Sequence, residues 1–172
     1  MILESEKFSD DRGFFIESFN QRDFNECVGE EVIFVQDNHS KSTKGVLRGL
    51  HYQLNYPQGK LVRCICGDVF DVAVDLRKNS STFGQWSGTR LNSSEIQLWV
   101  PAGFAHGFYT LSEEAEICYK ITDYYHPEDQ HSLLWDDPSL DIQWGNSEQP
   151  ILSAKDKLGK LFDECLKYEN TI

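Results

Sequence analysis

The sequence has few basic residues for its acidic content. It contains 16 lysines and arginines against 28 aspartates and glutamates, which gives a formal net charge of −12. A surface of this sign repels the phosphate backbone of DNA and RNA, so we do not expect extended nucleic-acid binding. A small phosphorylated ligand is still compatible, because salt screens charges beyond about 8 Å and a few arginines in one cleft then dominate.

The sequence also lacks a long apolar run and a secretory signal. No apolar stretch approaches the roughly 20 residues that span a bilayer. The opening Met-Ile-Leu-Glu-Ser-Glu-Lys contains neither a basic segment nor an apolar segment. We therefore expect a soluble, cytoplasmic protein that has no membrane partner.

Cysteine pairs of the kind that bind zinc or staple a small secreted domain are absent as well. The chain has five cysteines, an odd number, and none of them forms a Cys-x-x-Cys motif. We expect free thiols at Cys27, Cys64, Cys66, Cys118 and Cys165.

The chain does contain many short β-branched and aromatic segments separated by turn residues. Because its 172 residues include 40% hydrophobic ones and no repeat or long linker, we expect one domain over residues 1–172. Short strands at this spacing are typical of a sandwich or barrel. The segments expected as strands are Val32 to Val35, Val46 to Gln53, Leu61 to Cys66, Val69 to Leu76, Gln85 to Leu91, Ile96 to Val100, Gly107 to Leu111 and Ile117 to Tyr124.

Two segments carry a helical pattern. Near the end of the chain, apolar residues recur at the spacing of an amphipathic helix, and Ser153 and Asp156 are suited to cap its start. A shorter helix is expected over Gln21 to Cys27. The sequence thus predicts a mainly β fold with a few peripheral helices, including a C-terminal helix through Leu158, Leu161, Phe162, Cys165 and Leu166.

Two apolar segments contain polar residues that ordinary core strands would not have. Arg48 and His51 lie within Val46 to Gln53, and His106 closes a Pro-x-Gly-x-x-His turn after Pro101. Either histidine alone is more often a satisfied core residue than a catalyst. The turn resembles the second motif of the cupin superfamily, which implies a jelly-roll β-barrel.

The first cupin motif, however, departs from the metal-binding pattern. Metal-binding cupins supply His-x-His and a nearby glutamate, whereas this chain has His51-Tyr52-Gln53 and, further on, Lys60. Several imidazoles and a carboxylate therefore cannot converge on one ion, and the positive charge of Lys60 would repel it. We expect a site without metal.

A series of segments distributed along the chain matches one known family in order. They are Asp11 to Glu17, Phe34 to Ser40, Val46 to Gln53, Gln58 to Arg63, Val69 to Arg77, Pro101 to Phe108, Tyr119-Lys120, Asp123 to Tyr125 and Leu152 to Asp156. So many ordered matches are difficult to obtain by chance, and through them the chain resembles the dTDP-4-dehydrorhamnose 3,5-epimerase family over nearly its whole length.

The resemblance implies proton exchange at carbons 3 and 5 of a dTDP-linked 4-keto-6-deoxyhexose, without a cofactor. By resemblance His51 is the base, and Asp156 is its partner as well as a candidate helix cap. Tyr119 matches the acid on the other face of the sugar. Lys60 matches the residue near the ketone oxygen, where negative charge develops.

The resemblance also implies which side chains bind the substrate. Arg12, Arg48 and His106 match positions at the diphosphate or sugar, Glu17, Gln36 and Asn38 match positions near the nucleoside, and Lys60 and Lys155 also match ligand contacts. Gln130 stands where the family usually has a glutamate, so one charge is lost there. The family further implies a homodimer, in which an amino-terminal strand carrying Arg12 and Glu17 serves the neighbouring subunit's site.

Three alternatives remain open at this point. A relative that inverts only carbon 3 would share the same base, acid and lysine. A cupin-like protein that binds sugar nucleotides without turnover would not need His51, Asp156 and Tyr119 together. A metal-dependent cupin oxygenase would bind stoichiometric metal.

Overall fold

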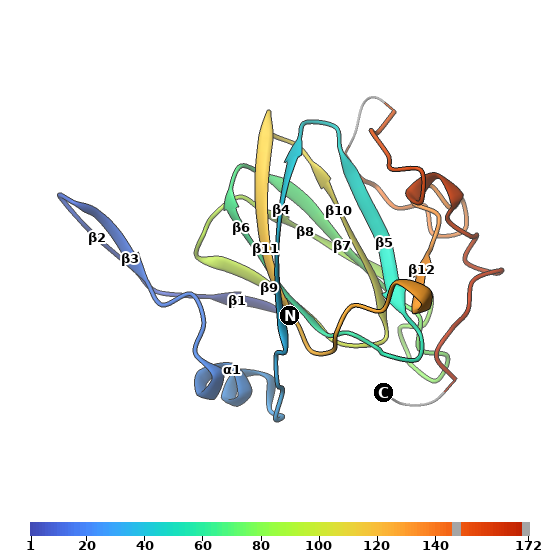
Figure 1. The fold of residues 1–172 in the computed structure, drawn as a ribbon, viewed down its shortest axis with the longest axis horizontal. Helices are drawn as coiled ribbons and strands as arrows, with labels where there is room; N and C mark the ends of the chain where they lie inside the picture. Colours follow the sequence, from blue (N-terminus) through green and yellow to red (C-terminus); the bar gives the residue numbers. More distant parts are fainter. Residues whose placement is uncertain (146–148, 170–172) are drawn as a thin grey trace.

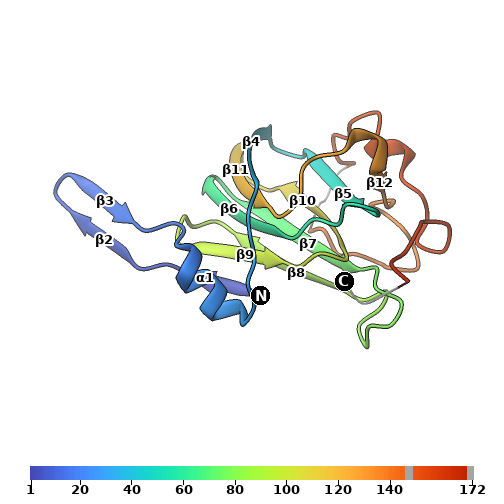
Figure 2. The same cartoon turned by 60° about the horizontal axis from the view of Figure 1, so that its bottom comes forward.

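The computed structural model describes residues 1–145 and 149–169 as two antiparallel sheets that face each other, as Figures 1 and 2 show. The first sheet has the order β1 (Ile2–Glu4), β9 (Ile96–Val100), β6 (Lys60–Cys66), β11 (Glu114–Ile121) and β4 (Gln36–Thr43). The second has the order β12 (Gln130–Ser132), β5 (Leu47–Gln53), β10 (Phe104–Thr110), β7 (Val69–Asp75) and β8 (Trp86–Leu91).

The strands are connected as a jelly roll. From β4 to β11, the first strand pairs with the last, β5 with β10, β6 with β9, and β7 with β8. The expected mainly β, cupin-like jelly roll is therefore confirmed. Between the described strands no ladder joins the two sheets, so the molecule is a sandwich and not a closed barrel.

The core occupies two layers. Between the sheets, Val62, Phe108 and Ile117 belong to one buried cluster, because alternate side chains of each strand point inward. Strand β7 is buried on both faces, and its outward Val72 and Val74 pack under the C-terminal segment. This double burial explains the nearly continuous apolar sequence of β7.

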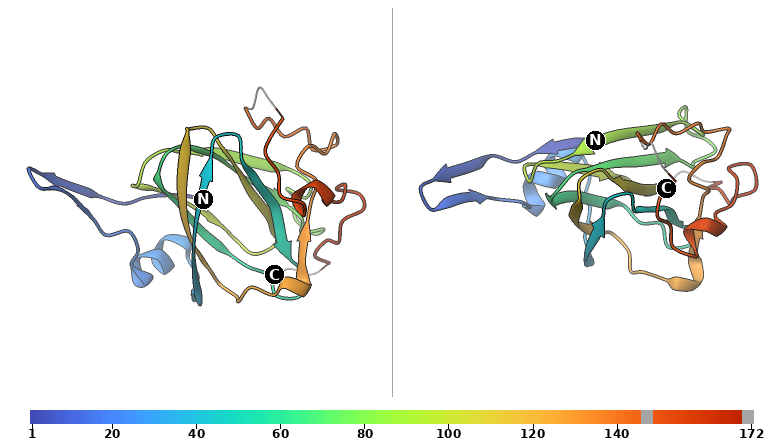
Figure 3. Two further views of the ribbon diagram at one scale, coloured as in Figure 1. Left: turned by 45° about the horizontal axis from the view of Figure 1, so that its top comes forward. Right: turned by 90° about the horizontal axis from the view of Figure 1, so that it is seen from above.

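The amino-terminal part adds a hairpin and a helix. Strands β2 (Lys7–Asp10) and β3 (Gly13–Ile16) form a hairpin that projects from the body of the molecule (Figures 1 and 3). The expected short helix is present as α1 (Gln21–Val28), with Asn20 as its N-cap and Gly29 at φ 78° as its C-cap. Phe24 of α1 packs edge-on against Trp99 of the first sheet, which holds the helix in place.

The prediction of a C-terminal helix was wrong. Only one 3₁₀ turn, η2 (Asp156–Leu158), forms there, and the following chain is an irregular strap over the second sheet (Figure 1). Gly159 is extended (φ −55°, ψ 144°), and Lys160 and Tyr168 form bridges with Leu133 and Arg77. These contacts with the sheet replace helical hydrogen bonds, and Leu158 of the supposed apolar face is 81% exposed.

Of the eight strands expected from the sequence, the structure contradicts one and contains strands that overlap the other seven. The expected strand Val32 to Val35 was wrong: Val32 and Phe34 pack in one cluster with Phe24 of α1, and regular strand pairing starts only at Gln36. The remaining seven expected strands overlap β5 to β11. Strands β1 to β4 and β12 and the 3₁₀ turn η1 (Pro127–Asp129) were not anticipated. The described part of the chain has no helix long and apolar enough to cross a membrane.

Candidate active site

One cavity of about 310 Å³ opens between the sheets beside β4, β5 and β11. His51 and Gln53 reach it from β5, Lys60 from β6 and Tyr119 from β11. The other residues that line it are Gln36, Asn38, Tyr52, Gln58, Ile121, Tyr125 and Gln130. Three of the four expected catalytic residues therefore share one cavity, and the fourth, Asp156, contacts His51 from behind.

The sheet geometry around His51 depends on two glycines. At Gly49 (φ +112°), an added Cβ would lie 2.6 Å from the Cα of Gly107, so β5 and β10 approach closely at this point. His51 pairs with His106 across the same strands. Only glycine at positions 49 and 107 leaves room for the two strands to approach this closely. The close approach fixes the position of the β5 backbone from which the His51 side chain extends into the cavity.

His51 and Asp156 form a tight pair although they are 105 residues apart in sequence. The distance between His51 Nε2 and Asp156 Oδ1 is 2.5 Å, and Ser153 Oγ donates to Asp156 Oδ2 over 2.7 Å. Because a carboxylate only accepts, Nε2 carries the hydrogen. Nδ1 therefore bears the lone pair, and no described residue hydrogen-bonds to it.

The electrostatics of the pair favour a neutral imidazole next to a charged carboxylate. Burial lowers the pKa of His51, Asp156 offsets part of this effect, and the positive charge of Lys60 lowers the pKa further. Burial alone would raise the pKa of Asp156, but hydrogen bonds from His51 and Ser153 outweigh it, and the net direction is downward. His51 is thus ready to accept a proton at neutral pH.

Lys60 provides the positive charge of the cavity. Its side chain is buried, and Nζ donates to the carbonyl oxygen of His51 over 3.2 Å. Burial lowers its pKa to about 8, against the opposing influence of Asp71, so the ammonium form predominates at neutral pH. The preceding Gly59 is required, because a Cβ there would lie 2.4 Å from the ring of Trp99.

Tyr119 faces the cavity from the sheet opposite His51. It pairs with Asn38 on β4 and with Val62 on β6. Burial raises the pKa of its phenol, although Arg48 opposes this effect in part. The phenol therefore keeps its proton at neutral pH and can act as a donor.

The residues expected to bind the substrate, apart from Arg12 and Glu17, lie around this cavity at different depths. Gln36 Nε2 donates to Asn38 Oδ1 over 2.8 Å in the wall, and Gln130 reaches the wall from β12. Two others flank it: Arg48 Nε donates to Ser42 over 2.9 Å, and exposed Lys155 lines an adjoining hollow of about 360 Å³ that also includes Gln130. Buried His106 lies deeper, with its Nε2 2.8 Å from Oδ1 of Asp71.

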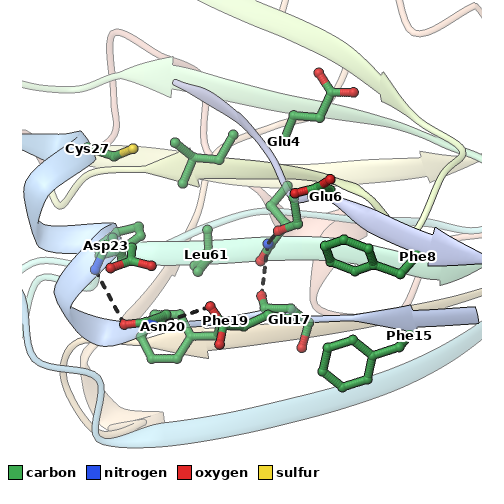
Figure 4. Close-up of a pocket in the computed structure, with 15 residues that line it drawn as sticks. Glu4, Glu6, Phe8, Phe15, Glu17, Phe19, Asn20, Asp23, Cys27 and Leu61 are labelled. Atoms are coloured by element: carbon green, nitrogen blue, oxygen red, sulfur yellow. Dashed lines mark hydrogen bonds between the residues drawn. The ribbon is translucent and has the colours of Figure 1, made fainter.

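Two expected ligand contacts lie away from the cavity of their own chain. Arg12 is at the turn of the β2–β3 hairpin, where its side chain is 90% exposed and its Nε donates to Asp10 over 3.0 Å. Glu17 lines a separate hollow of about 490 Å³ beside the hairpin and α1, shown in Figure 4. There it accepts a hydrogen bond of 3.2 Å from Asn20.

The structure adds cavity residues that sequence reasoning missed. Gln53 Nε2 donates to the carbonyl oxygen of Tyr124 over 3.1 Å, and Gln58 Nε2 donates to that of Asp123 over 3.0 Å. Both amides hold the loop after β11, from which Tyr125 reaches the cavity. The strand alternation that places residues 51 and 53 on one face could have indicated Gln53.

The chemistry offered by the cavity is proton transfer next to a fixed positive charge. The imidazole of His51, with a free lone pair, and the protonated phenol of Tyr119 face the cavity from opposite sheets. The ammonium group of Lys60 lines the cavity from the same sheet as Tyr119. Among residues 1–145 and 149–169, no group of three histidine, cysteine, aspartate or glutamate side chains could hold a metal ion. Together with the fold, this arrangement defines a cupin-type jelly-roll protein with an acid–base site.

The chain belongs to the dTDP-4-dehydrorhamnose 3,5-epimerase family, whose model matches residues 1–164. It is 58% identical over 166 residues to the dTDP-4-dehydrorhamnose 3,5-epimerase of Pseudomonas aeruginosa, covering 96% of this chain and 92% of the relative. All segments on which the sequence resemblance was based lie within this matched range.

Solved structures agree with this assignment. The dTDP-6-deoxy-D-glucose-3,5-epimerase of Legionella pneumophila, in complex with dTDP-4-keto-L-rhamnose, superimposes with a TM-score of 0.96 at 50% identity, covering 99% of this chain and 93% of that one. A 3'-monoepimerase of Streptomyces bikiniensis in complex with dTDP-quinovose has a TM-score of 0.88 at 31% identity, covering 94% and 83%.

Proposed function

We propose that this chain is a single-domain nucleotide-sugar epimerase that converts dTDP-4-dehydro-6-deoxy-D-glucose to dTDP-4-dehydro-L-rhamnose. The observation that carries the proposal is that His51 and Tyr119 line one cavity from opposite sheets, and that Lys60 lines the same cavity. A sugar ring bound between the sheets has one face toward a base and the other toward an acid. The names of the similar proteins support the choice of substrate.

His51 starts the reaction by removing a proton from the carbon next to the ketone. The proton goes to Nδ1, and the resulting imidazolium is stabilised by the hydrogen bond from Nε2 to Asp156. The electron pair of the broken C–H bond moves into the ring and leaves an enolate with its charge on the ketone oxygen. Lys60 stabilises this charge as it develops.

Tyr119 completes the inversion from the opposite face. Its hydroxyl donates a proton to the same carbon, the enolate returns to the ketone, and the configuration is inverted. Carbons 3 and 5 are both adjacent to the carbonyl at carbon 4, so the same groups serve both. Before the next inversion, at the second carbon or in the next cycle, His51 releases its proton to solvent and the Tyr119 phenolate takes one up.

The nucleotide end of the substrate extends toward the mouth of the cavity. Gln36, Asn38 and Gln130 supply neutral hydrogen-bonding groups there, and Arg48 and Lys155 are the nearby cationic groups. His106, which lies deeper, is on the side of the sugar and not at the mouth. At the position of Gln130, the usual glutamate of the family would add a negative charge beside a charged diphosphate. A glutamine keeps the hydrogen bonds without that repulsion.

A homodimer completes the site in this proposal. The hairpin carries Phe8, Phe14 and Phe15 with exposures of 55%, 57% and 67%, an apolar surface that a partner subunit would cover. A hairpin that crosses to the partner brings Arg12 and Glu17 to the partner's cavity. We place this dimer in the cytoplasm, where sugar nucleotides are made.

The test is proton NMR of the reaction in deuterated water. The double epimerase places deuterium at carbons 3 and 5 and yields the L-rhamno product. Deuterium at carbon 3 alone would establish the alternative, a 3-epimerase such as the similar Streptomyces bikiniensis protein. A chain that binds the substrate without any exchange would be a sugar-nucleotide-binding protein, which would refute the proposal.

A further inference from the structure

A second buried pair of titratable groups lies behind the cavity. Asp71 of β7 is fully buried, and its Oδ1 accepts a hydrogen bond of 2.8 Å from Nε2 of His106 on β10. Its other oxygen, Oδ2, is also buried and has no hydrogen-bond partner in the described part of the chain. Such an oxygen is costly, because a buried carboxylate needs hydrogen bonds or a compensating positive charge.

Lys60 can provide the compensating charge. Lys60 on β6 is two residues from Val62, and Asp71 on β7 is two residues from Val69, and both valines belong to the cluster between the sheets. Strand alternation therefore points both buried side chains into the sandwich interior, one from each sheet. They do not form a direct ion pair, and among the described residues Nζ donates to the His51 carbonyl alone. Of the charged groups nearby, Asp71 is the one that counteracts the effect of burial on the pKa of Lys60.

The other titratable groups around Lys60 do not offer an equivalent negative charge. His51 of β5 is neutral, and Asp156 behind it is committed to His51 and Ser153. Tyr119 of β11 has a pKa above its usual value, so it is uncharged. His106 of β10 contributes no negative charge in either protonation state.

We propose that Asp71 is a positioning residue for the reaction: its carboxylate, held in place by His106, keeps Lys60 as an ammonium group aimed at the ketone oxygen. The inference rests on the proposed epimerase function. It assigns a purpose to a buried carboxylate oxygen that the fold leaves without a hydrogen bond. It also explains how a buried lysine next to the proposed base stays charged.

The first test measures the ionisation of Lys60 directly, without turnover. The ¹⁵N resonance of its Nζ, assigned by its loss in Lys60→Met, is followed against pH in wild type and Asp71→Asn. The amide oxygen introduced by Asp71→Asn keeps a hydrogen-bond acceptor for His106, and we expect the pKa of Lys60 to fall by about one pH unit or more. An unchanged pKa would overturn the proposal.

Two further variants serve as controls. Asp75→Asn removes another buried carboxylate of β7, one that is bound to Arg77, and should leave the pKa of Lys60 in place. His106→Asn keeps the Asp71 carboxylate, so the pKa of Lys60 should remain above that in Asp71→Asn. If the pKa of Lys60 fell equally in His106→Asn, its value would depend on His106 and not on the charge of Asp71, which would contradict the proposal. If Asp71→Asn does not fold, Asp71→Ser removes the same charge with a smaller side chain.

The second test reads the same coupling in catalysis. If Lys60 must be charged, kcat/KM for exchange at carbon 3 declines at alkaline pH as Lys60 loses its proton. Asp71→Asn should move this decline to lower pH by the same interval as the NMR titration. An alkaline decline at the wild-type pH would contradict the proposal. Absence of exchange in the wild type would instead refute the proposed function, while the NMR titration would still report on Asp71 and Lys60.

Discussion

At the scale of single residues, burial and hydrogen bonds set the protonation states of four titratable side chains in and behind the cavity. Burial lowers the pKa of His51 and Lys60 and raises that of Tyr119, while hydrogen bonds keep that of Asp156 low. At neutral pH these directions give a neutral base, a protonated acid and a charged lysine together.

The first prediction concerns Asp156→Asn. Because His51 must be neutral to act, kcat/KM rises with pH through the pKa of His51. Asp156 raises that pKa, so its removal should shift this rise to lower pH. The plateau should also fall by about 100-fold or more, since the imidazolium loses its partner. A pH profile of kcat/KM with an unshifted acid side would contradict the assigned role.

The second prediction concerns Lys60→Met, which replaces the ammonium group by an apolar chain of similar length. We expect kcat to fall by about 100- to 1,000-fold with a small change in KM, because the charge acts on the enolate more than on the bound ketone. Steady-state kinetics would measure both. Lys157→Met, at an exposed position of η2, is the matched control and should retain wild-type kcat. A loss confined to KM would show that Lys60 only binds substrate.

At the scale of secondary structure elements, the sequence was a good guide to the strands and a poor guide to the last segment. Alternating apolar residues within β5 to β11 have few alternatives to a sheet. The apolar residues between positions 158 and 166, in contrast, are compatible with two structures. One is an amphipathic helix, and the other is an irregular segment whose apolar side chains pack one by one against the sheet. Only the tertiary contacts of Lys160, Cys165 and Tyr168 decide between them, and these partners are distant in sequence.

The candidate site, too, could be predicted only in part from the sequence. His51, Lys60 and Tyr119 were identified by resemblance, and the structure brings them into one cavity. Asp71 lies in an apolar strand whose pattern does not reveal what its side chain faces. Its contact with His106 arises from strand pairing between β7 and β10, which a single sequence does not specify.

The third prediction tests the close approach of β5 and β10. Gly49→Ala combines a positive φ with a Cβ 2.6 Å from the backbone of Gly107, so it should destabilise the fold by about 2 kcal/mol or more. Gly29→Ala, the control, has a positive φ but open space, and should cost about 1 kcal/mol. Urea unfolding would measure both. Equal losses would mean that the strand contact has no energetic weight.

At the scale of the whole molecule, the hairpin is the feature that a single chain does not explain. It projects from the body of the molecule (Figure 1), and its phenylalanines are exposed. Arg12 lies at its turn and Glu17 follows its second strand, and neither residue lines the cavity of the same chain. A partner subunit accounts for both observations. The active unit would then be a dimer with two cavities, each built from two chains.

The fourth prediction uses two defective variants together. Arg12→Ala and His51→Asn should each have low activity, the first through weak substrate binding and the second through loss of the base. Co-expressed with different affinity tags and purified as heterodimers, they should regain activity in one of the two cavities. That cavity combines His51 of one subunit with Arg12 of the other. If the hairpin served its own chain, no intact cavity would form and the heterodimer would stay inactive.

The central claim is that His51 removes a proton and Tyr119 returns one to the opposite face of the sugar. Its most direct test is proton NMR in deuterated water with His51→Asn and Tyr119→Phe, both shown to bind dTDP. We expect no exchange at carbons 3 and 5 with His51→Asn, and exchange at carbon 3 without inversion with Tyr119→Phe. Wild-type exchange in His51→Asn, or wild-type inversion in Tyr119→Phe, would contradict the claim.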